Sequence, residues 1–280
     1  MRNILVTGSA GFIGKNLVHA LNRTGQYMVW EFDRDSPDGL LGEALARADV
    51  VFHLAGENRP PDPADFEAVN VGLTRRVVQV LSDLHRRPRL IFASSIQAEN
   101  DSPYGRSKRE AEDELRHFAE STGRRVVTYR LRNVFGKWSR PNYNSVVATF
   151  CHNVARDLPI TVNDPARVLE LVYIDDVVAS FIAEIDRASS APFSYADVPV
   201  SYRATVADLA TTIQGFRQSR RSGWIPDFCD GLTRALYATY LANLDEDDFA
   251  YALDTKADPR GTLAEPVSYT HLRAHETGRN

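Results

Sequence analysis

A glycine-rich turn near the start of the chain constrains the fold more than any other feature. The apolar run 3–7 ends directly at Gly8, and Gly11 and Gly14 follow at three-residue intervals as a helical stripe begins. Glycines there let a pyrophosphate approach the backbone N–H groups and the positive end of the helix dipole without a Cβ clash. A tight turn without a ligand would need the same glycines, but the first turn of a sheet is where dinucleotides bind. We therefore expect a dinucleotide to be held by Gly8, Ala10, Gly11, Phe12, Ile13 and Gly14.

Strand-like and helical patterns alternate through the first half of the chain. The strand-like runs are 3–7, 27–32, 49–56, 89–95 and 125–131, and the helical patterns between them include 40–47, 66–80 and 104–120. Such alternation predicts an α/β fold, namely a Rossmann-type doubly wound parallel sheet with helices on both faces.

The alternation loosens after Phe135. The segment 136–145 is polar and rich in turn residues, and a strand near 168 runs into a helix that continues to about Arg187. Further helices are expected at 146–155, from Thr205 onward and at 232–241. We expect residues 1–250 to form one NAD(P)-binding domain with a small, mostly helical substrate-binding lobe, built from 136–169 and 200–248.

Composition excludes several classes of function. The chain has 33 basic and 37 acidic residues and a net charge of -4, which argues against a nucleic-acid partner. No apolar run approaches the roughly 20 residues needed to cross a bilayer, so we expect no membrane partner and a cytoplasmic location. Cys151 and Cys229 give no disulfide framework. His53 has no second ligand at a useful spacing, so no metal site is expected.

Two adjacent residues bear on the choice of cofactor. Asp33 ends the second strand-like run, where a carboxylate hydrogen-bonds the ribose 2′-OH of NAD. Arg34 follows it, and an arginine there accepts the 2′-phosphate of NADP instead. Exposed loop charges would look the same, so the residues alone leave NAD and NADP both open.

The stretch SPYGRSK, 102–108, places Tyr104 and Lys108 four residues apart, on one face of a helix. Only four of the 33 basic residues are lysines. An ammonium beside a phenol would lower the pKa of Tyr104 and make it usable for proton transfer. Chance would also produce such a pair, so the assignment depends on the rest of the chain.

Four features together resemble the extended short-chain dehydrogenase/reductase superfamily, in its nucleotide-sugar epimerase/dehydratase branch. They are the glycine turn, the HLAG sequence at 53–56, the serines at 94 and 95, and the Tyr104–Lys108 pair. The resemblance covers about 1–187. It implies catalytic roles for Ser95, rather than Ser94, with Tyr104 and Lys108. It also implies cofactor contacts from Leu54, Ala55, Gly56, Tyr104 and Lys108, in addition to the glycine turn, Asp33 and Arg34.

The resemblance also points to a substrate side. RLRNVFG, 130–136, is similar to a family segment that places Asn133 near the sugar nucleotide. Contacts with the sugar or diphosphate are expected from the next segment, at Lys137, Arg140, Asn142 and Asn144. The alternative for these four residues is an ordinary polar loop.

Ser95 and Tyr104 are only nine residues apart, which is short for the family. This spacing, and FGKWSRPNYNSVVATF at 135–150, resemble a narrower group, the bifunctional capsular-polysaccharide enzymes called CapF. That group implies NADPH-dependent reduction of the C4 ketone of a UDP-linked 6-deoxy-4-keto-N-acetylhexosamine, on the route to UDP-N-acetyl-L-fucosamine. NADP(H) is thus favoured, with NAD(H) left open. A UDP-sugar is the expected partner molecule, and a homodimer is also left open.

Two other functions compete with this interpretation. An NAD-dependent nucleotide-sugar epimerase or dehydratase would use the same residues, and Asp33 favours it mildly. A non-catalytic dinucleotide sensor would have no need of the Ser95, Tyr104 and Lys108 set.

The end of the chain follows a different pattern. Residues 251–266 resemble the opening of the cupin half in the bifunctional group, or a linker to it. Residues 267–280 resemble the translation of a sequencing-adapter read, so we expect a non-native tail and a longer natural protein. On this interpretation the spacing of His271 and His275 carries no meaning for metal binding.

Overall fold

The computed structural model describes residues 1–37, 39–59, 62, 66–188, 190–223, 225–250 and 255–264. The chain divides into two compact units. The first contains 1–145 and 169–203, and the second contains 146–168 and the described residues from 204 onward.

A six-stranded sheet forms the centre of the first unit. The strand order is β2-β1-β3-β4-β5-β8, and every neighbouring pair is parallel. Leu5 pairs with Trp30 on one side and Val51 on the other, so the chain order reverses beside β1. In open parallel sheets ligands bind at such a reversal, outside the carboxyl ends of the strands. The strands are β1 (Arg2–Thr7), β2 (Tyr27–Phe32), β3 (Val50–His53), β4 (Arg89–Ser95), β5 (Val126–Leu131) and β8 (Phe193–Ala196).

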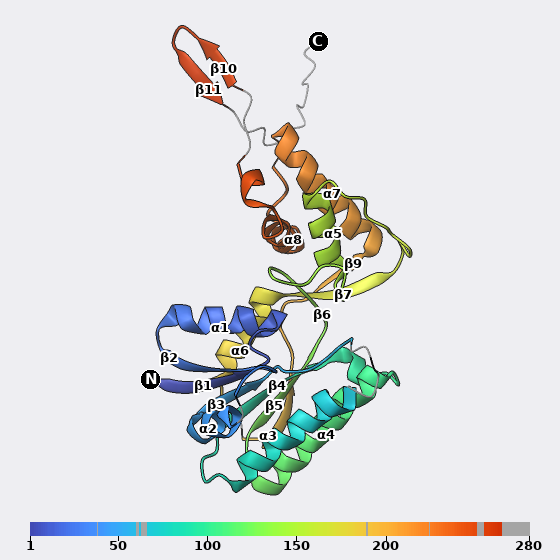
Figure 1. The fold of residues 1–280 in the computed structure, drawn as a ribbon. Coiled ribbons are helices and arrows are strands. Elements are labelled where there is room, and N and C mark those ends of the chain that lie inside the picture. Colours follow the sequence, from blue (N-terminus) through green and yellow to red (C-terminus); the bar gives the residue numbers. More distant parts are fainter. Residues whose placement is uncertain are drawn as a thin grey trace, which may run out of the picture. The chain divides into compact units, whose positions relative to one another are not determined.

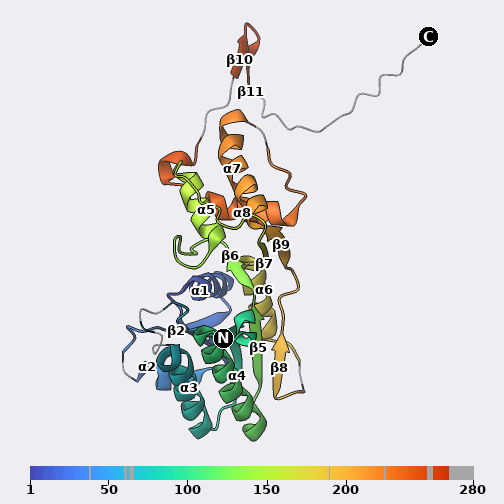
Figure 2. The ribbon, with the colours of Figure 1, turned by 90° about the vertical axis from the view of Figure 1, so that its right-hand side faces the viewer.

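Helices cover both faces of this sheet (Figures 1 and 2). Helices α1 (Phe12–Thr24) and α6 (Ile174–Glu184) pack on one face through Leu17 and Phe181, against strand residues such as Ile4. Helices α2 (Leu40–Arg47), α3 (Gly72–Asp83) and α4 (Pro103–Thr122) pack on the other, against residues such as Leu5. Neighbouring strand residues point to opposite faces, so both clusters are buried. The predicted doubly wound α/β sheet is therefore confirmed.

The start of α4 is fixed by local sequence. The Ser102 hydroxyl accepts a hydrogen bond from the N–H of Gly105 at 3.0 Å, and Pro103 occupies the first turn. A serine cap followed by proline is a strong helix start, because the serine accepts from a free N–H of the first turn and the proline has no N–H that would need a partner. The expected helix around Tyr104 is confirmed and extends to Thr122.

The helix expected at 66–80 has an irregular beginning. Its first part, Glu67–Val71, is a π-helical turn, and the regular α3 starts only at Gly72. Such turns are frequent at functional sites, and this one contains Asn70, which is described below.

A small separate sheet contains β6 (Asn133–Phe135), β7 (Val168–Tyr173) and β9 (Tyr202–Thr205), in the order β6-β7-β9. Phe135 and Tyr173 are paired across the parallel β6–β7 ladder. As expected, β7 runs directly into a helix, α6. Asp175 and Asp176 lie in its first turn, where acidic side chains favour the helix dipole.

Three helices build most of the second unit: α5 (Val146–Ala155), α7 (Val206–Ser222) and α8 (Gly231–Leu241). Phe216 of α7 packs its ring against Tyr237 and Tyr240 of α8. Thr205 and Asp208 form the expected capping box at the start of α7. A short turn, Glu246–Asp248, follows α8.

The segment 136–145 falls in the first unit, whereas the sequence placed it in the helical lobe. The reason is a set of long-range contacts. Asn16 donates a hydrogen bond to the carbonyl of Lys137 at 3.2 Å, and Tyr143 donates one to Glu57 Oε1 at 2.8 Å. The bounds of the lobe differ from the expected 136–169 and 200–248 accordingly.

Residues 255–264 form an antiparallel hairpin of β10 (Thr255–Asp258) and β11 (Gly261–Ala264). The N–H of Arg260 donates to Asp258 Oδ1 at 2.8 Å within the turn. The expectation of a cupin opening or a linker concerned residues 251–266, and the structure describes only 255–264 of them. The expectations for 267–280, including His271 and His275, lie outside the described residues.

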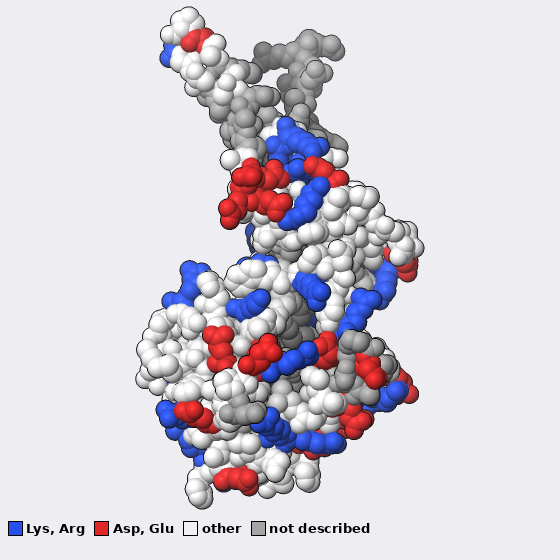
Figure 3. All heavy atoms as spheres, in the orientation of Figure 1, with Lys and Arg blue, Asp and Glu red and all other residues white. Residues whose placement is uncertain are grey.

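On the face drawn in Figure 3, basic and acidic side chains are interspersed on the first unit. None of the helices in the described part of the chain has the length and apolar character to span a bilayer.

Candidate active site

The glycine turn after β1 is closed against the loop that follows β3. Gly8 has φ of 71°, a conformation that side chains rarely adopt, and a Cβ there would lie 2.7 Å from the Cα of Ala55. A Cβ on Gly14 would lie 2.0 Å from the carbonyl oxygen of Gly8. The two loops therefore meet at the point where the strand order reverses, and only glycine fits at either position.

The first turn of α1 is open to an anion. Gly11 caps the helix without a side-chain hydrogen bond, and no acidic residue lies in the first turn. The helix therefore presents backbone N–H groups and the positive end of its dipole at the glycine turn. A cofactor pyrophosphate is expected in this cradle, with Phe12 and Ile13 as donors, because the N–H of Gly11 already donates to the carbonyl of Gly8 at 3.1 Å.

Asp33 and Arg34 lie beside the same turn. Asp33 Oδ2 accepts a hydrogen bond from the N–H of Ala10 at 2.6 Å. Arg34 reaches Glu57 Oε2 at 3.4 Å, and 76% of its side chain is exposed. Both residues follow β2, where a carboxylate would meet the ribose 2′-OH of NAD and a guanidinium the 2′-phosphate of NADP.

The structure separates the two serines that end β4. Ser94 is buried, and its hydroxyl donates to Glu112 Oε1 at 2.5 Å. Ser95 points the other way, because successive strand residues alternate, and its hydroxyl accepts from the N–H of Gln97 at 3.1 Å. Only Ser95 has a hydrogen bond with the phenol of Tyr104.

Tyr104 is half-buried, with its ring 5.7 Å from that of Phe66. Burial raises the pKa of Tyr104, and its hydrogen bond with Ser95 offsets part of this increase. The expectation that Lys108 lowers the pKa of Tyr104 is therefore wrong for this structure. The sequence shows the charge four residues away but not the burial of the phenol.

Lys108 is 5% exposed, and its ammonium donates to the carbonyl of Ala93 at 3.0 Å. Burial lowers the pKa of Lys108 to about 8, and Glu112, one helical turn further along, opposes the shift. Burial and, to a smaller extent, Lys108 also lower the pKa of His53 to about 3. His53 bridges Thr7 and Thr74 at 2.8 and 3.0 Å, so it is a packed structural residue.

Glu112 is a buried residue that sequence reasoning missed. Arg130 holds both of its oxygens through bonds of 2.6 to 3.2 Å, and Tyr195 donates to it at 2.9 Å. Glu112 lies on the same face of α4 as Tyr104 and Lys108, which precede it by eight and four residues. Continuing the four-residue spacing from Tyr104 would have found it.

A second missed network surrounds Asn70 in the π-helical turn. Its amide donates to Ser107 Oγ at 2.9 Å and to the carbonyl of Glu57 at 3.0 Å. Glu57 in turn accepts from Tyr143, and Arg59 donates to the carbonyl of Tyr143 at 2.6 Å. These contacts join the loop after β3 to the segment 136–145 and to α4. These contacts join residues that are far apart in the sequence, so no local sequence pattern predicts them.

The five predicted substrate residues are placed as follows. The amide of Asn133 donates to the carbonyl of Glu170 at 2.9 Å, and Lys137 pairs with Asp175 at 2.5 Å. Arg140 stacks 5.1 Å from the ring of Tyr143. Asn142 has φ of 55°, and both Asn142 and Asn144 are exposed. The contacts of Lys137 and Tyr143 bring this segment beside α1 and the loop after β3, which carry the cofactor cradle.

Comparison with known proteins agrees with this geometry. The model of the NAD dependent epimerase/dehydratase family matches residues 4–194. The chain belongs to this family. The expected superfamily, and NAD(P)-dependent enzyme chemistry as its general class, are therefore confirmed.

Two relatives are similar over most of the chain. A UDP-2-acetamido-2,6-beta-L-arabino-hexul-4-ose reductase from Pseudomonas aeruginosa is 47% identical, over 94% of this chain and 70% of the relative. The crystal structure of the capsular polysaccharide assembling protein CapF from Staphylococcus aureus superposes with a TM-score of 0.82 at 36% identity. It covers 93% of this chain and 70% of that one. These matches confirm the resemblance to the CapF group.

A more distant structure supports the fold. The Bordetella bronchiseptica enzyme WbmF in complex with NAD+ has a TM-score of 0.72 at 20% identity, covering 85% of this chain and 91% of that one. Within the described part of this chain, no three His, Cys, Asp or Glu side chains gather as a metal-binding group.

Proposed function

We propose that this enzyme reduces the C4 ketone of a UDP-linked 6-deoxy-4-keto-N-acetylhexosamine with NADPH. The observation that carries the proposal is the Tyr104 phenol, hydrogen-bonded to Ser95 at the carboxyl end of β4. The Pseudomonas relative is a hexul-4-ose reductase by name, which supports the choice of substrate.

The chemistry follows from the three side chains. The bound cofactor supplies a hydride to C4. Tyr104 gives its proton to the ketone oxygen as the C–O bond becomes an alcohol, and Ser95 donates a hydrogen bond to that oxygen. The raised pKa of Tyr104 keeps it protonated and ready to act as the acid. Solvent then returns a proton to Tyr104, and the Lys108 ammonium would contact the nicotinamide ribose.

The segment 133–145 contributes the substrate contacts in this proposal. Lys137 and Arg140 would meet the diphosphate, and Asn133, Asn142 and Asn144 the sugar. Lys137 is paired with Asp175, so a diphosphate would compete with that carboxylate for the ammonium. The helical unit formed by α5, α7 and α8 serves as the substrate lobe.

The proposed preference for NADPH depends on Arg34. Its largely exposed guanidinium lies next to Asp33, where a 2′-phosphate would replace Glu57 as its partner. An Arg34→Ala variant should raise the KM for NADPH at least about tenfold and leave the KM for NADH nearly unchanged. Equal effects on both cofactors would remove Arg34 from the choice.

The decisive experiment mixes the protein with NADPH and UDP-2-acetamido-2,6-dideoxy-β-L-arabino-hexul-4-ose. We expect NADPH consumption and a product heavier by two hydrogens. Tyr104→Phe should bind NADPH normally and lose about 10²- to 10⁴-fold in kcat. Tyr27→Phe, a change of the same size in β2, serves as the control. Normal turnover in Tyr104→Phe would remove this residue from the mechanism.

A second function is favoured by one observation. The Asp33 carboxylate stands where NAD would present its 2′-OH, and this suits an epimerase that keeps its NAD and makes no net redox change. Purified protein carrying bound NAD, and a sugar isomer formed without NADPH consumption, would favour this alternative.

A further inference from the structure

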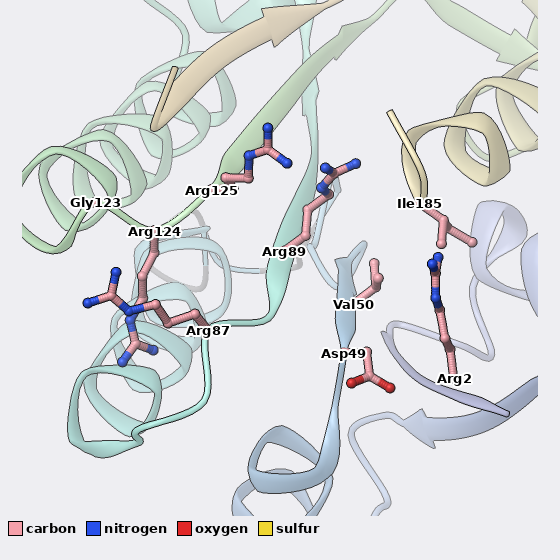
Figure 4. A pocket seen from close by; sticks show the side chains of 9 residues that line it. All are labelled: Arg2, Asp49, Val50, Arg87, Arg89, Gly123, Arg124, Arg125 and Ile185. Carbon is pink, nitrogen blue, oxygen red and sulfur yellow. The ribbon is translucent and has the colours of Figure 1, made fainter. Parts of the chain in front are cut away.

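A hollow of about 330 Å³ lies at the amino-terminal edge of the main sheet, away from the glycine turn (Figure 4). Arg2 and Arg89 are the first residues of β1 and β4, and Arg125 directly precedes β5. Gly8 and Ser95 lie at the other ends of these strands. Strands of six or seven residues rise about 20 Å, so the hollow is separate from the candidate active site. Its charged lining consists of Arg2, Arg87, Arg89, Arg124, Arg125 and Asp49.

Only part of the positive charge of this hollow is balanced, since Arg89 Nη1 lies 3.8 Å from the carboxylate of Glu184. Its one carboxylate, Asp49, is already paired with Arg86 outside the lining, and Arg2 is paired with Asp186. Among the residues that the structure describes, neither Arg87 nor Arg125 has a carboxylate partner. Burial lowers the pKa of Arg89, and its neighbour Arg125 lowers it further. In the same way, burial and the neighbouring Arg87 lower the pKa of Arg124. Arginines are thus held together against their mutual repulsion.

Arg124 supplies a second, independent observation. It is 7% exposed, and one of its terminal nitrogens donates to the carbonyl of Leu84. Its other terminal nitrogen, Nη1, is buried without a hydrogen-bond partner among the described residues. Buried donors without acceptors are rare in folded proteins and call for a partner. The guanidinium group of Arg87 lies beside it in Figure 4.

Not every arginine here is available to a ligand. Arg89 donates to the carbonyls of Glu184 and Arg187 at the end of α6, so it has a structural role. Arg87, Arg124 and Arg125 remain as donors, with forks that match phosphate oxygens in two-point hydrogen bonds. The lining contains no aromatic ring on which a nucleobase could stack. The volume is at the lower end for ligand sites.

We propose that this hollow is a second binding site, for a small phosphate-type oxyanion carrying at least two charges, such as inorganic diphosphate. Arg87 and Arg125 supply charge, and Arg124, whose Nη1 is closed to solvent in this conformation, turns toward the ion to donate to it.

The test is calorimetric titration of inorganic pyrophosphate into the full chain saturated with NADPH and UDP, which occupy the glycine turn and the proposed diphosphate contacts of the substrate. We expect one pyrophosphate per chain and binding that weakens as salt rises. The double variant Arg87→Ala/Arg125→Ala should weaken binding at least about tenfold. The control Arg23→Ala/Arg76→Ala removes the same charge elsewhere and should bind as the parent does. Equal affinity in both variants, or no saturable binding to the parent, would overturn the proposal.

Two further arms sharpen the result. If the double variant does not fold, the single change Arg125→Gln replaces it, with the same expected direction. Titration with citrate tests whether the site selects phosphate groups or binds any small multivalent anion. Weaker binding of citrate than of pyrophosphate supports the proposal, and tighter binding of citrate overturns the assignment to phosphates.

Discussion

The ammonium of Lys108 occupies the space that a side chain at Gly56 would need. A Cβ at position 56 would lie 3.0 Å from Lys108 Nζ and 3.0 Å from Asn70 Oδ1. A methyl group at position 56 would therefore fit only if the Lys108 ammonium or the Asn70 amide moved by a few tenths of an ångström. This contact ties the loop after β3 to the candidate catalytic helix.

Replacing Gly56 by alanine should displace this ammonium. We expect Gly56→Ala to lower kcat at least about tenfold, because a general acid works only in a well-fixed geometry. Gly42→Ala is the matched control, since nothing lies within 4 Å of its added methyl group. In the interior of α2 that change should raise the free energy of unfolding by about 0.5–1 kcal/mol. Steady-state kinetics and urea unfolding check both, and full activity in Gly56→Ala would contradict the prediction.

Replacing each of the two adjacent serines should affect a different property, kcat for Ser95 and the free energy of unfolding for Ser94. Ser95→Ala removes a donor to the ketone oxygen and should cost about 10²–10³ in kcat. Ser94→Ala leaves Glu112 short of one hydrogen bond and should cost about 1–3 kcal/mol of unfolding free energy, with a smaller effect on kcat. The measurements are NADPH oxidation and urea unfolding on both variants. If Ser94→Ala proves the more damaging to kcat, the assignment must be exchanged.

The pKa of Lys108 sets a limit on activity at high pH. Burial holds this pKa at about 8, below its ordinary 10.5, so the ammonium is lost as the pH rises through 8. The proposed contact of the ammonium with the nicotinamide ribose is then lost. We expect kcat/KM for reduction to level off below pH 8 and to fall about tenfold per pH unit well above it. A profile that stays flat to pH 9 would exclude this role for Lys108.

His53 should make the fold sensitive to acid. Its pKa in the folded chain is about 3, far below its ordinary 6.5. Between these values the unfolded chain binds a proton that the folded chain excludes, so the free energy of unfolding falls as the pH falls below 6.5. The slope contributed by this group is at most about 1.4 kcal/mol per pH unit. Urea unfolding at pH 7, 6 and 5 should show a shallower slope for His53→Gln than for the parent, and equal slopes would refute the prediction.

Local patterns were sufficient for the first five strands of the main sheet and for the glycine turn, whereas β8 was not among the predicted strands. A buried parallel strand, a glycine that must turn and a helix that follows are all encoded within about 20 residues of one another. The Tyr104–Lys108 pair and the helix cap at Thr205 are equally local. The roles of Ser95, Tyr104 and Lys108 stay predictions until the variants are measured.

Other features needed the third dimension. The pKa of Tyr104 rises because the phenol is buried, and burial arises from elements far away in sequence. The segment 136–145 joined the first unit through Tyr143 and Glu57, which are 86 residues apart. The arginines that line the hollow at the amino-terminal edge of the sheet come from three separate parts of the chain, so no single stretch of sequence predicts that they lie together.

The short connection between Ser95 and Tyr104 is filled with backbone. A Cβ at Gly105 would lie 2.3 Å from the carbonyl oxygen of Gln97 and 2.5 Å from that of Asn100, so α4 rests directly on the turn that precedes it. A residue inserted in this turn would have to displace α4 from that contact. The pocket for the proposed sugar is therefore shaped by other segments of this chain, such as 136–145, rather than by this connection.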